Sequence, residues 1–136
     1  MAQKILFIDD DSYVQLWVDA AKEAGYQTRQ SYTTDEAYQE AETWKPDLVV
    51  LDIMMPPGTR YAHRKTQNGL RSGLFLLEDL RALDPDLPVL VLTNVRDDET
   101  LRQFDSFQSL KIVQKRDSPP FDFVEEIELM LRETER

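Results

Sequence analysis

Short apolar runs alternate along this chain with longer segments in which apolar and polar residues mix. The apolar runs predict buried strands at residues 4–8, 48–51, 87–92 and 110–113. Residues 26–31 are more polar and predict a strand at the edge of a sheet. The pattern therefore predicts five strands, each separated from the next by a mixed segment.

Helical spacing of apolar residues fills most of the mixed segments. In the first of them, Ser12 is the predicted N-cap and Gly25 the stop. The residues that recur there at helical spacing are Tyr13, Leu16, Trp17, Ala20, Ala21 and Ala24. Further helices are predicted at about 34–44, around the leucines of 76–83, at about 96–107, and from the Ser118-Pro119 pair onward.

This alternation of strand and helix predicts an α/β fold with a parallel sheet covered by helices on both faces. The doubly wound, flavodoxin-like arrangement of this class has the strand order 2-1-3-4-5. The length of 136 residues suits one domain over 1–136. A long irregular segment, 56–73, interrupts the pattern as an insertion between the third strand and the third helix.

Composition narrows the class of protein further. Hydrophobic residues make up 41% of the chain, which is typical of a globular domain, and the absence of cysteine excludes disulfides and thiolate metal sites. The N-terminal apolar run is too short for a signal peptide, and no run is long enough to span a bilayer. We therefore expect a soluble, cytoplasmic protein without a membrane partner.

The charge of the chain is strongly negative but uneven. A formal net charge of −10 disfavours direct binding to nucleic acid. Residues 53–77 nevertheless contain four cations and no acid: Arg60, Arg64, Lys65 and Arg71. Two interpretations of this insertion stay open: a mobile surface loop, or a docking surface for an acidic partner formed by these cations with Tyr61 and His63.

Polar residues follow four of the predicted strands. Asp9, Asp10 and Asp11 come after the first strand and Asp52 after the third, whereas Thr93 and Lys115 close the fourth and fifth. Because parallel strands end at one edge of a sheet, these side chains are expected to converge. Clustered carboxylates favour Mg²⁺, and a carboxylate can act as a nucleophile to form an aspartyl phosphate.

Taken one at a time, these residues have ordinary interpretations. Asp10 suits a helix N-terminus, Thr93 suits a β-strand, and Lys115 suits a solvated strand end. Asp52 is harder to explain in this way, because a carboxylate that closes an apolar strand lies near the core. The joint pattern, with each residue at the end of a different strand, favours a functional site.

The motifs ILFIDDDS, LVVLDIMMP, VLVLTN and IVQK resemble, in this order, the receiver domain of two-component response regulators, in the CheY-like superfamily. The resemblance covers essentially the whole chain. It implies that Asp52 is the phosphoacceptor and that Asp9, Asp10, Asp52 and the Met54 carbonyl hold Mg²⁺. It also implies that Thr93 and Lys115 contact the phosphoryl group, and it assigns no role to Asp11.

The resemblance further implies a signalling module rather than an enzyme. A histidine kinase or histidine phosphotransfer protein would phosphorylate Asp52 and thereby switch the binding of an effector protein. The chain departs from the family at Ile112, where an aromatic residue is usual, at Arg116, where proline is common, and in the insertion. Whether the chain is a stand-alone receiver or part of a longer regulator stays open.

Two other functions compete with the phosphoacceptor hypothesis. The first is a receiver-like interaction module that acts mainly through the 56–73 insertion. The second is a Mg²⁺-dependent phosphohydrolase in which Asp9 is the nucleophile, since Asp9 and Asp11 form an Asp-x-Asp pair after the first strand. This second hypothesis leaves Asp52 unexplained.

Overall fold

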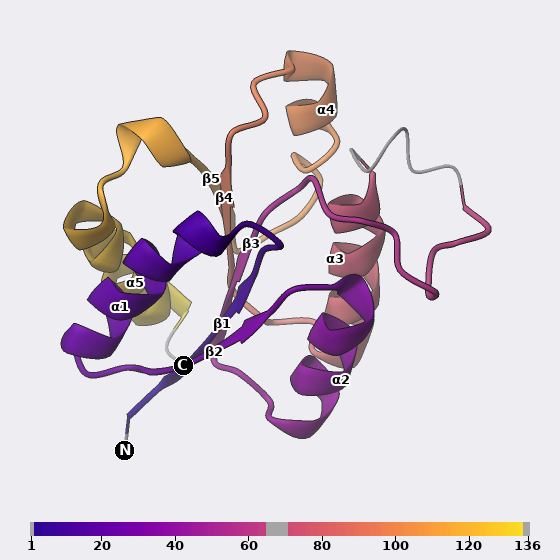
Figure 1. The fold of residues 1–136 in the computed structure, drawn as a ribbon. Helices are drawn as coiled ribbons and strands as arrows, with labels where there is room; N and C mark the ends of the chain where they lie inside the picture. The colour runs from indigo at the N-terminus through magenta and orange to yellow at the C-terminus, as the bar shows by residue number, and fades with distance from the viewer. Residues whose placement is uncertain (1, 65–70, 135–136) are drawn as a thin grey trace.

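A computed structural model, which describes residues 2–64 and 71–134, shows a parallel sheet between two layers of helices (Figure 1). The strands are β1 (Lys4–Ile8), β2 (Gln27–Ser31), β3 (Leu48–Leu51), β4 (Val89–Thr93) and β5 (Leu110–Gln114). Their order in the sheet is β2-β1-β3-β4-β5, and all neighbours run parallel. The predicted fold class and strand order are confirmed.

Helices cover both faces of this sheet. They are α1 (Gln15–Glu23), α2 (Thr34–Thr43), α3 (Ser72–Leu83), α4 (Asp98–Arg102) and α5 (Pro120–Thr134), with short 3₁₀ turns η1 (Ser12–Val14) and η2 (Lys115–Asp117). In Figure 1, α1 and α5 lie on one face and α2 and α3 on the other. No helix of the described ranges combines the length and apolar character that crossing a bilayer requires.

Each face of the sheet has its own hydrophobic core, because alternate residues of a strand point to opposite faces. Leu6 and Ile8 of β1 pack toward α2 and α3, whereas Ile5 and Phe7 pack toward α1 and α5. The central strands β1, β3 and β4 are almost fully buried, whereas β2 alternates between exposed and covered residues. This difference confirms β2 as the polar edge strand.

The first helix differs from its prediction in both its cap and its buried face. Asp11, rather than Ser12, accepts the capping hydrogen bond from the Tyr13 N–H, at 2.9 Å. A 3₁₀ turn then delays the α-helix to Gln15, and the buried face begins at Val14 and Val18. Tyr13 and Leu16, which were predicted to share the buried face, are 74% and 57% exposed.

The helix predicted at 96–107 is also shorter than expected. The α-helix ends at Arg102, and the chain continues through turns in which four N–H groups, those of Gln103, Phe104, Asp105 and Phe107, donate to the carbonyl three residues earlier. Phe104 alone of this continuation is fully buried. The segment lacks a continuous apolar stripe, so burial of one ring fixes the chain without a longer helix. The last helix begins at Pro120, slightly later than predicted.

Helix α1 is joined by a hydrogen bond to the turn that precedes α5. The Trp17 indole N–H donates to the Ser118 carbonyl at 2.9 Å, and the ring packs against the core beneath α1 and α5. Ser118 is separated from Lys115 by only two residues. The indole therefore lies on the α1–α5 side, close to the end of the sheet at which β5 finishes.

The described first half of the insertion, residues 56–64, lies across helices α2 and α3, and we call it the strap (Figure 1). The Thr34 hydroxyl donates to the Pro57 carbonyl at 2.9 Å. The Asp35 carboxylate accepts from the backbone N–H groups of Thr59 and Arg60, both at 3.0 Å. Between these contacts, Gly58 has a φ of 62°, and a Cβ there would meet Asp35 Oδ2 and Thr34 Oγ1 at 2.8 Å.

Tyr61 anchors the strap in the core on the α2–α3 side. Its side chain is 2% exposed, its ring lies 5.8 Å from the ring of Phe75, and its hydroxyl donates to Asp79 at 2.7 Å. Arg60 pairs with the same carboxylate at 3.0 Å and stacks on the ring of Tyr38. These contacts correct the docking-surface hypothesis, since Tyr61 is buried and the charge of Arg60 is already paired.

The other members of the hypothesised docking surface differ in their contacts and exposure. Arg64 stacks on Phe75, with the guanidinium carbon 3.6 Å from the ring centre, and Arg71 approaches the same ring at 5.3 Å. His63 is exposed. Lys65 lies outside the described residues. The strap is therefore held to the domain by polar and aromatic side chains, while a mobile surface loop stays a prediction.

Candidate functional site

The predicted site residues meet where the carboxyl ends of the strands converge. Asp9 follows β1 and Asp52 follows β3, while Thr93 ends β4 and Lys115 directly follows β5. Asp10, Asp52, Thr93 and Lys115 line a cavity of about 780 Å³ at this edge, together with Met54, Met55, Pro56 and Pro57 and the residues of 94–97. The convergence inferred from the strand ends is thus present.

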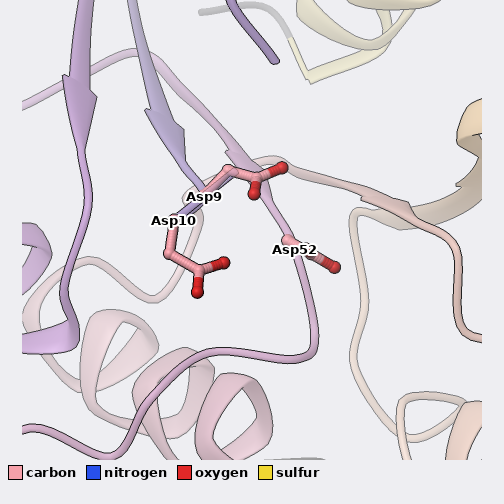
Figure 2. Close-up of side chains that lie close together, drawn as sticks. All are labelled: Asp9, Asp10 and Asp52. Carbon is pink, nitrogen blue, oxygen red and sulfur yellow. The ribbon is translucent and has the colours of Figure 1, made fainter. Parts of the chain in front are cut away.

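Three carboxylates form the acidic part of this site (Figure 2). One oxygen each of Asp9, Asp10 and Asp52 lies within 4.8 Å of the other two. Asp9 is buried, whereas Asp10 is exposed toward solvent. Such a set of hard oxygen donors, open on one side, suits a divalent cation that keeps part of its water shell.

Lys115 supplies the positive charge of the site. Its Nζ lies 2.8 Å from Asp9 Oδ2 and 3.6 Å from Asp52 Oδ2, and only 8% of the side chain is exposed. The other oxygen of Asp9 accepts a hydrogen bond from the Asp11 N–H at 2.9 Å. Asp9 is therefore held in place by a backbone group and an ammonium, while Asp52 retains free oxygen surface at the cavity.

The electrostatics of the site shift the pKa of Asp52 upward. Burial is the main cause and the negative charge of Asp9 adds to it, raising the pKa from 3.8 to about 6. Lys115, the Thr93 hydroxyl and the Met54 N–H oppose the shift. Burial also raises the pKa of Asp9, although Lys115 and the Asp11 N–H act against it.

For Lys115, the neighbouring charges shift the pKa more than burial does. Burial lowers the pKa of its ammonium, but the charges of Asp52 and Asp9 outweigh burial and raise it above 10.5. The lysine therefore stays charged at neutral pH, as a group that attracts a phosphoryl or carboxylate anion must. One cation between buried carboxylates leaves the site with a net negative charge, which a second cation would balance.

We expect Asp52→Asn to stabilise the metal-free protein, and the gain to depend on pH. Folding takes up a proton at Asp52 between its unfolded pKa of 3.8 and its folded pKa of about 6. Wild-type stability therefore falls as pH rises through this range, whereas the amide of the variant does not ionise. The gain should be near zero below about pH 4 and reach about 1–3 kcal/mol above about pH 7.

Urea unfolding in a chelating buffer across this pH range measures the gain. Asp105→Asn is the matched control, because Asp105 is an exposed carboxylate on the surface beyond α4, and it should leave the pH profile unchanged. A variant at position 52 that is less stable than wild type at neutral pH would contradict the electrostatic interpretation.

The site also contains groups that the sequence pattern did not single out. Gln114 donates from its side chain to the Val95 carbonyl at 2.8 Å, and the Val95 N–H donates to the Thr93 hydroxyl at 3.1 Å. Gln114 lies within the IVQK motif, but the resemblance assigns it no role. Met54 is 46% exposed at the cavity, and its role as a carbonyl ligand of a metal stays a prediction.

A doubly wound parallel sheet with an acidic pocket beside β1 and β3 defines the CheY-like class of fold. The chain belongs to the response regulator receiver domain family, whose model matches residues 5–121. A solved structure of a CheY-like receiver domain protein from Methanospirillum hungatei superposes with a TM-score of 0.82 at 22% identity, and covers 99% of this chain and 98% of that one.

Relatives in sequence are also response regulators. The chain is 34% identical over 100 residues to the alkaline phosphatase synthesis transcriptional regulatory protein PhoP of Bacillus subtilis, covering 73% of this chain and 36% of PhoP. It is 25% identical over 93 residues to the chemotaxis protein CheY of Thermotoga maritima, covering 67% of each. The chain thus spans about a third of the length of the curated transcriptional regulators it matches.

Proposed function

We propose that this chain is a phosphoacceptor domain, 1–136, of a two-component signalling system, with Asp52 as the acceptor. The observation that supports this most directly is the contact of Lys115 with both Asp9 and Asp52 beside the buried hydroxyl of Thr93. These groups come from the ends of four strands. A structural ion pair alone would not require a hydroxyl donor and a solvent-facing cavity at the same point.

In the proposed reaction, an oxygen of Asp52 attacks the phosphorus of a phosphohistidine on a histidine kinase or histidine phosphotransfer protein. A P–O bond to Asp52 forms as the P–N bond breaks, and the imidazole leaves with its electron pair and takes up a proton. The Lys115 ammonium and the Thr93 hydroxyl stabilise the charge on the transferred phosphoryl oxygens. The role of this chain is then to carry a phosphoryl group that changes its surface for an effector.

The chemistry of the donor set fits Mg²⁺, and Asp9, Asp10, Asp52 and the Met54 carbonyl are the groups proposed to hold it. When bound, the ion would neutralise charge on the phosphoryl oxygens. Asp9 is already oriented by the Asp11 N–H and by Lys115, so its carboxylate is fixed before a cation arrives. Asp10 is exposed and supplies the solvent-facing ligand.

Incubation with Mg²⁺ and acetyl phosphate should add one phosphoryl group to the wild-type chain, as measured by intact mass. Asp52→Asn should abolish the adduct, because an amide oxygen is a poor nucleophile, and chelation of the metal should do the same. The control Asp105→Asn should be labelled like wild type.

The same experiment separates the competing phosphohydrolase hypothesis. Labelling that persists in Asp52→Asn but disappears in Asp9→Asn would identify Asp9 as the nucleophile and reject the proposal. Circular dichroism of each variant shows whether a loss of labelling reflects chemistry rather than unfolding.

A further inference from the structure

In the loop after β4, both backbone polar groups of Val95 form hydrogen bonds with side chains. Its N–H donates to the Thr93 hydroxyl at 3.1 Å, and its carbonyl accepts from the Gln114 side chain at 2.8 Å. Thr93 and Gln114 are register partners on the neighbouring strands β4 and β5. The two strands that carry the proposed phosphoryl-contacting residues therefore hold the same peptide segment.

These contacts lie beside the proposed phosphoacceptor, Asp52. The Thr93 hydroxyl and the Asp52 carboxylate line the same cavity, and the hydroxyl counteracts the rise in the pKa of Asp52. Gln114 immediately precedes Lys115, whose ammonium lies 3.6 Å from the same carboxylate. Val95 thus links Thr93 to the residue that precedes Lys115.

The two polar ends of the Gln114 carboxamide differ in their hydrogen bonding. Its NH₂ group donates to Val95, while its Oε1 is buried and accepts no hydrogen bond from any residue in the described ranges. A buried acceptor without a donor is costly. The hydrogen bond to Val95 therefore holds the Gln114 side chain in this orientation, and no other side-chain hydrogen bond within the described residues does so.

We propose that Gln114 is a positioning residue that holds the loop 94–97 in the conformation of the unphosphorylated protein. This inference rests on the proposed function. A phosphoryl group on Asp52 lies further out than the carboxylate itself, so the buried Thr93 hydroxyl has to shift outward to donate its one proton to a phosphoryl oxygen. Because the Val95 N–H is bonded to this hydroxyl, Val95 moves with it, and the Val95 carbonyl then pulls against the Gln114 bond.

Loss of this bond should therefore make the movement of the loop easier. Gln114→Met keeps the length of the side chain and removes the donor, whereas Gln114→Glu keeps its shape and places a carboxylate against the Val95 carbonyl. One such hydrogen bond corresponds to about a 2- to 10-fold change in the population of the displaced loop. Both variants should be labelled by acetyl phosphate and Mg²⁺ faster than wild type by a similar factor.

A second measurement reports on the loop itself. Hydrogen exchange followed by NMR, without phosphodonor, should show faster exchange of the Val95 amide in both variants, and unchanged exchange for amides within β4 and β5. If Gln114 had a purely structural role, its substitution would instead change amide exchange throughout the β4–β5 ladder and shift the unfolding midpoint. Gln39→Met is the matched control, because Gln39 is exposed on α2, and it should change neither quantity.

The outcomes separate this inference from the proposed function. Wild-type labelling rates in both Gln114 variants, or lower rates, overturn the positioning role, as does an unchanged Val95 amide. Absence of labelling in the wild type itself rejects the proposed function, and the exchange of the Val95 amide then decides alone whether Gln114 holds the loop.

Discussion

Tyr61→Ala is expected to lower the free energy of unfolding by about 3–5 kcal/mol. The side chain is 2% exposed, and its ring packs against Phe75 in the core on the α2–α3 side. Its removal leaves a cavity that the strap cannot easily close, because the chain on the N-terminal side is fixed to Thr34 and Asp35. Among the described residues, the loss also leaves the Asp79 carboxylate with Arg60 as its remaining side-chain partner.

Chemical denaturation monitored by circular dichroism measures this effect. Tyr61→Phe keeps the ring and removes only the hydrogen bond to Asp79, so it should lose about 1–2 kcal/mol. Tyr32→Ala removes a tyrosine that is 48% exposed and should change stability by less than about 1 kcal/mol. If Tyr61→Ala were as stable as Tyr32→Ala, the strap would not be part of the folded core.

Gly73→Ala is expected to destabilise the protein by about 1–3 kcal/mol, although alanine normally favours a helix. A Cβ at this position would lie 2.6 Å from the Ile53 carbonyl oxygen and 2.8 Å from the Ile53 Cα. Both atoms belong to the backbone, so a side chain cannot simply rotate away. The Gly73 N–H also donates to the same carbonyl at 3.1 Å, which draws the start of α3 onto the chain after β3.

The effect of Gly73→Ala should extend to the acceptor, since Ile53 directly follows Asp52. We expect slower labelling by acetyl phosphate in addition to the lower unfolding midpoint. Glu78→Ala, an exposed position in the same helix, serves as the control for helix propensity and should be neutral in both assays. A Gly73→Ala protein at least as stable as wild type would show that α3 shifts freely against β3.

The sheet and the site were predictable because their signals are local and repeated. Runs such as Leu48–Leu51 are apolar at every position, and this marks a strand that is buried on both faces. The parallel arrangement then places Asp52, Thr93 and Lys115 at one edge without further information. The strand order itself came from the class of fold, because neither apolar runs nor spacing determine which strands are neighbours.

The errors arose where one pattern admits two solutions. In the first helix, Tyr13 and Leu16 have helical spacing, but so do Val14 and Val18, and the 3₁₀ turn capped by Asp11 selects the second set. In the strap, Tyr61 is a single aromatic residue outside any periodic pattern, so the sequence pattern does not show that it is buried. Its burial depends on partners such as Asp79 that lie far away in the sequence. The hydrogen bond from Gln114 to Val95 is equally non-local.

The hydrogen bond from Trp17 to the Ser118 carbonyl gives the protein an optical probe of its own. The chain has two tryptophans, and Trp44 lies elsewhere, against Arg29 and Lys4. Trp17 instead touches the turn that leads from Lys115 into α5. In a Trp44→Phe background, all indole fluorescence would come from Trp17. Its hydrogen-bond partner Ser118 lies three residues after Lys115, the lysine proposed to bind the phosphoryl group. Ligand binding at Lys115 can therefore be followed without an added dye.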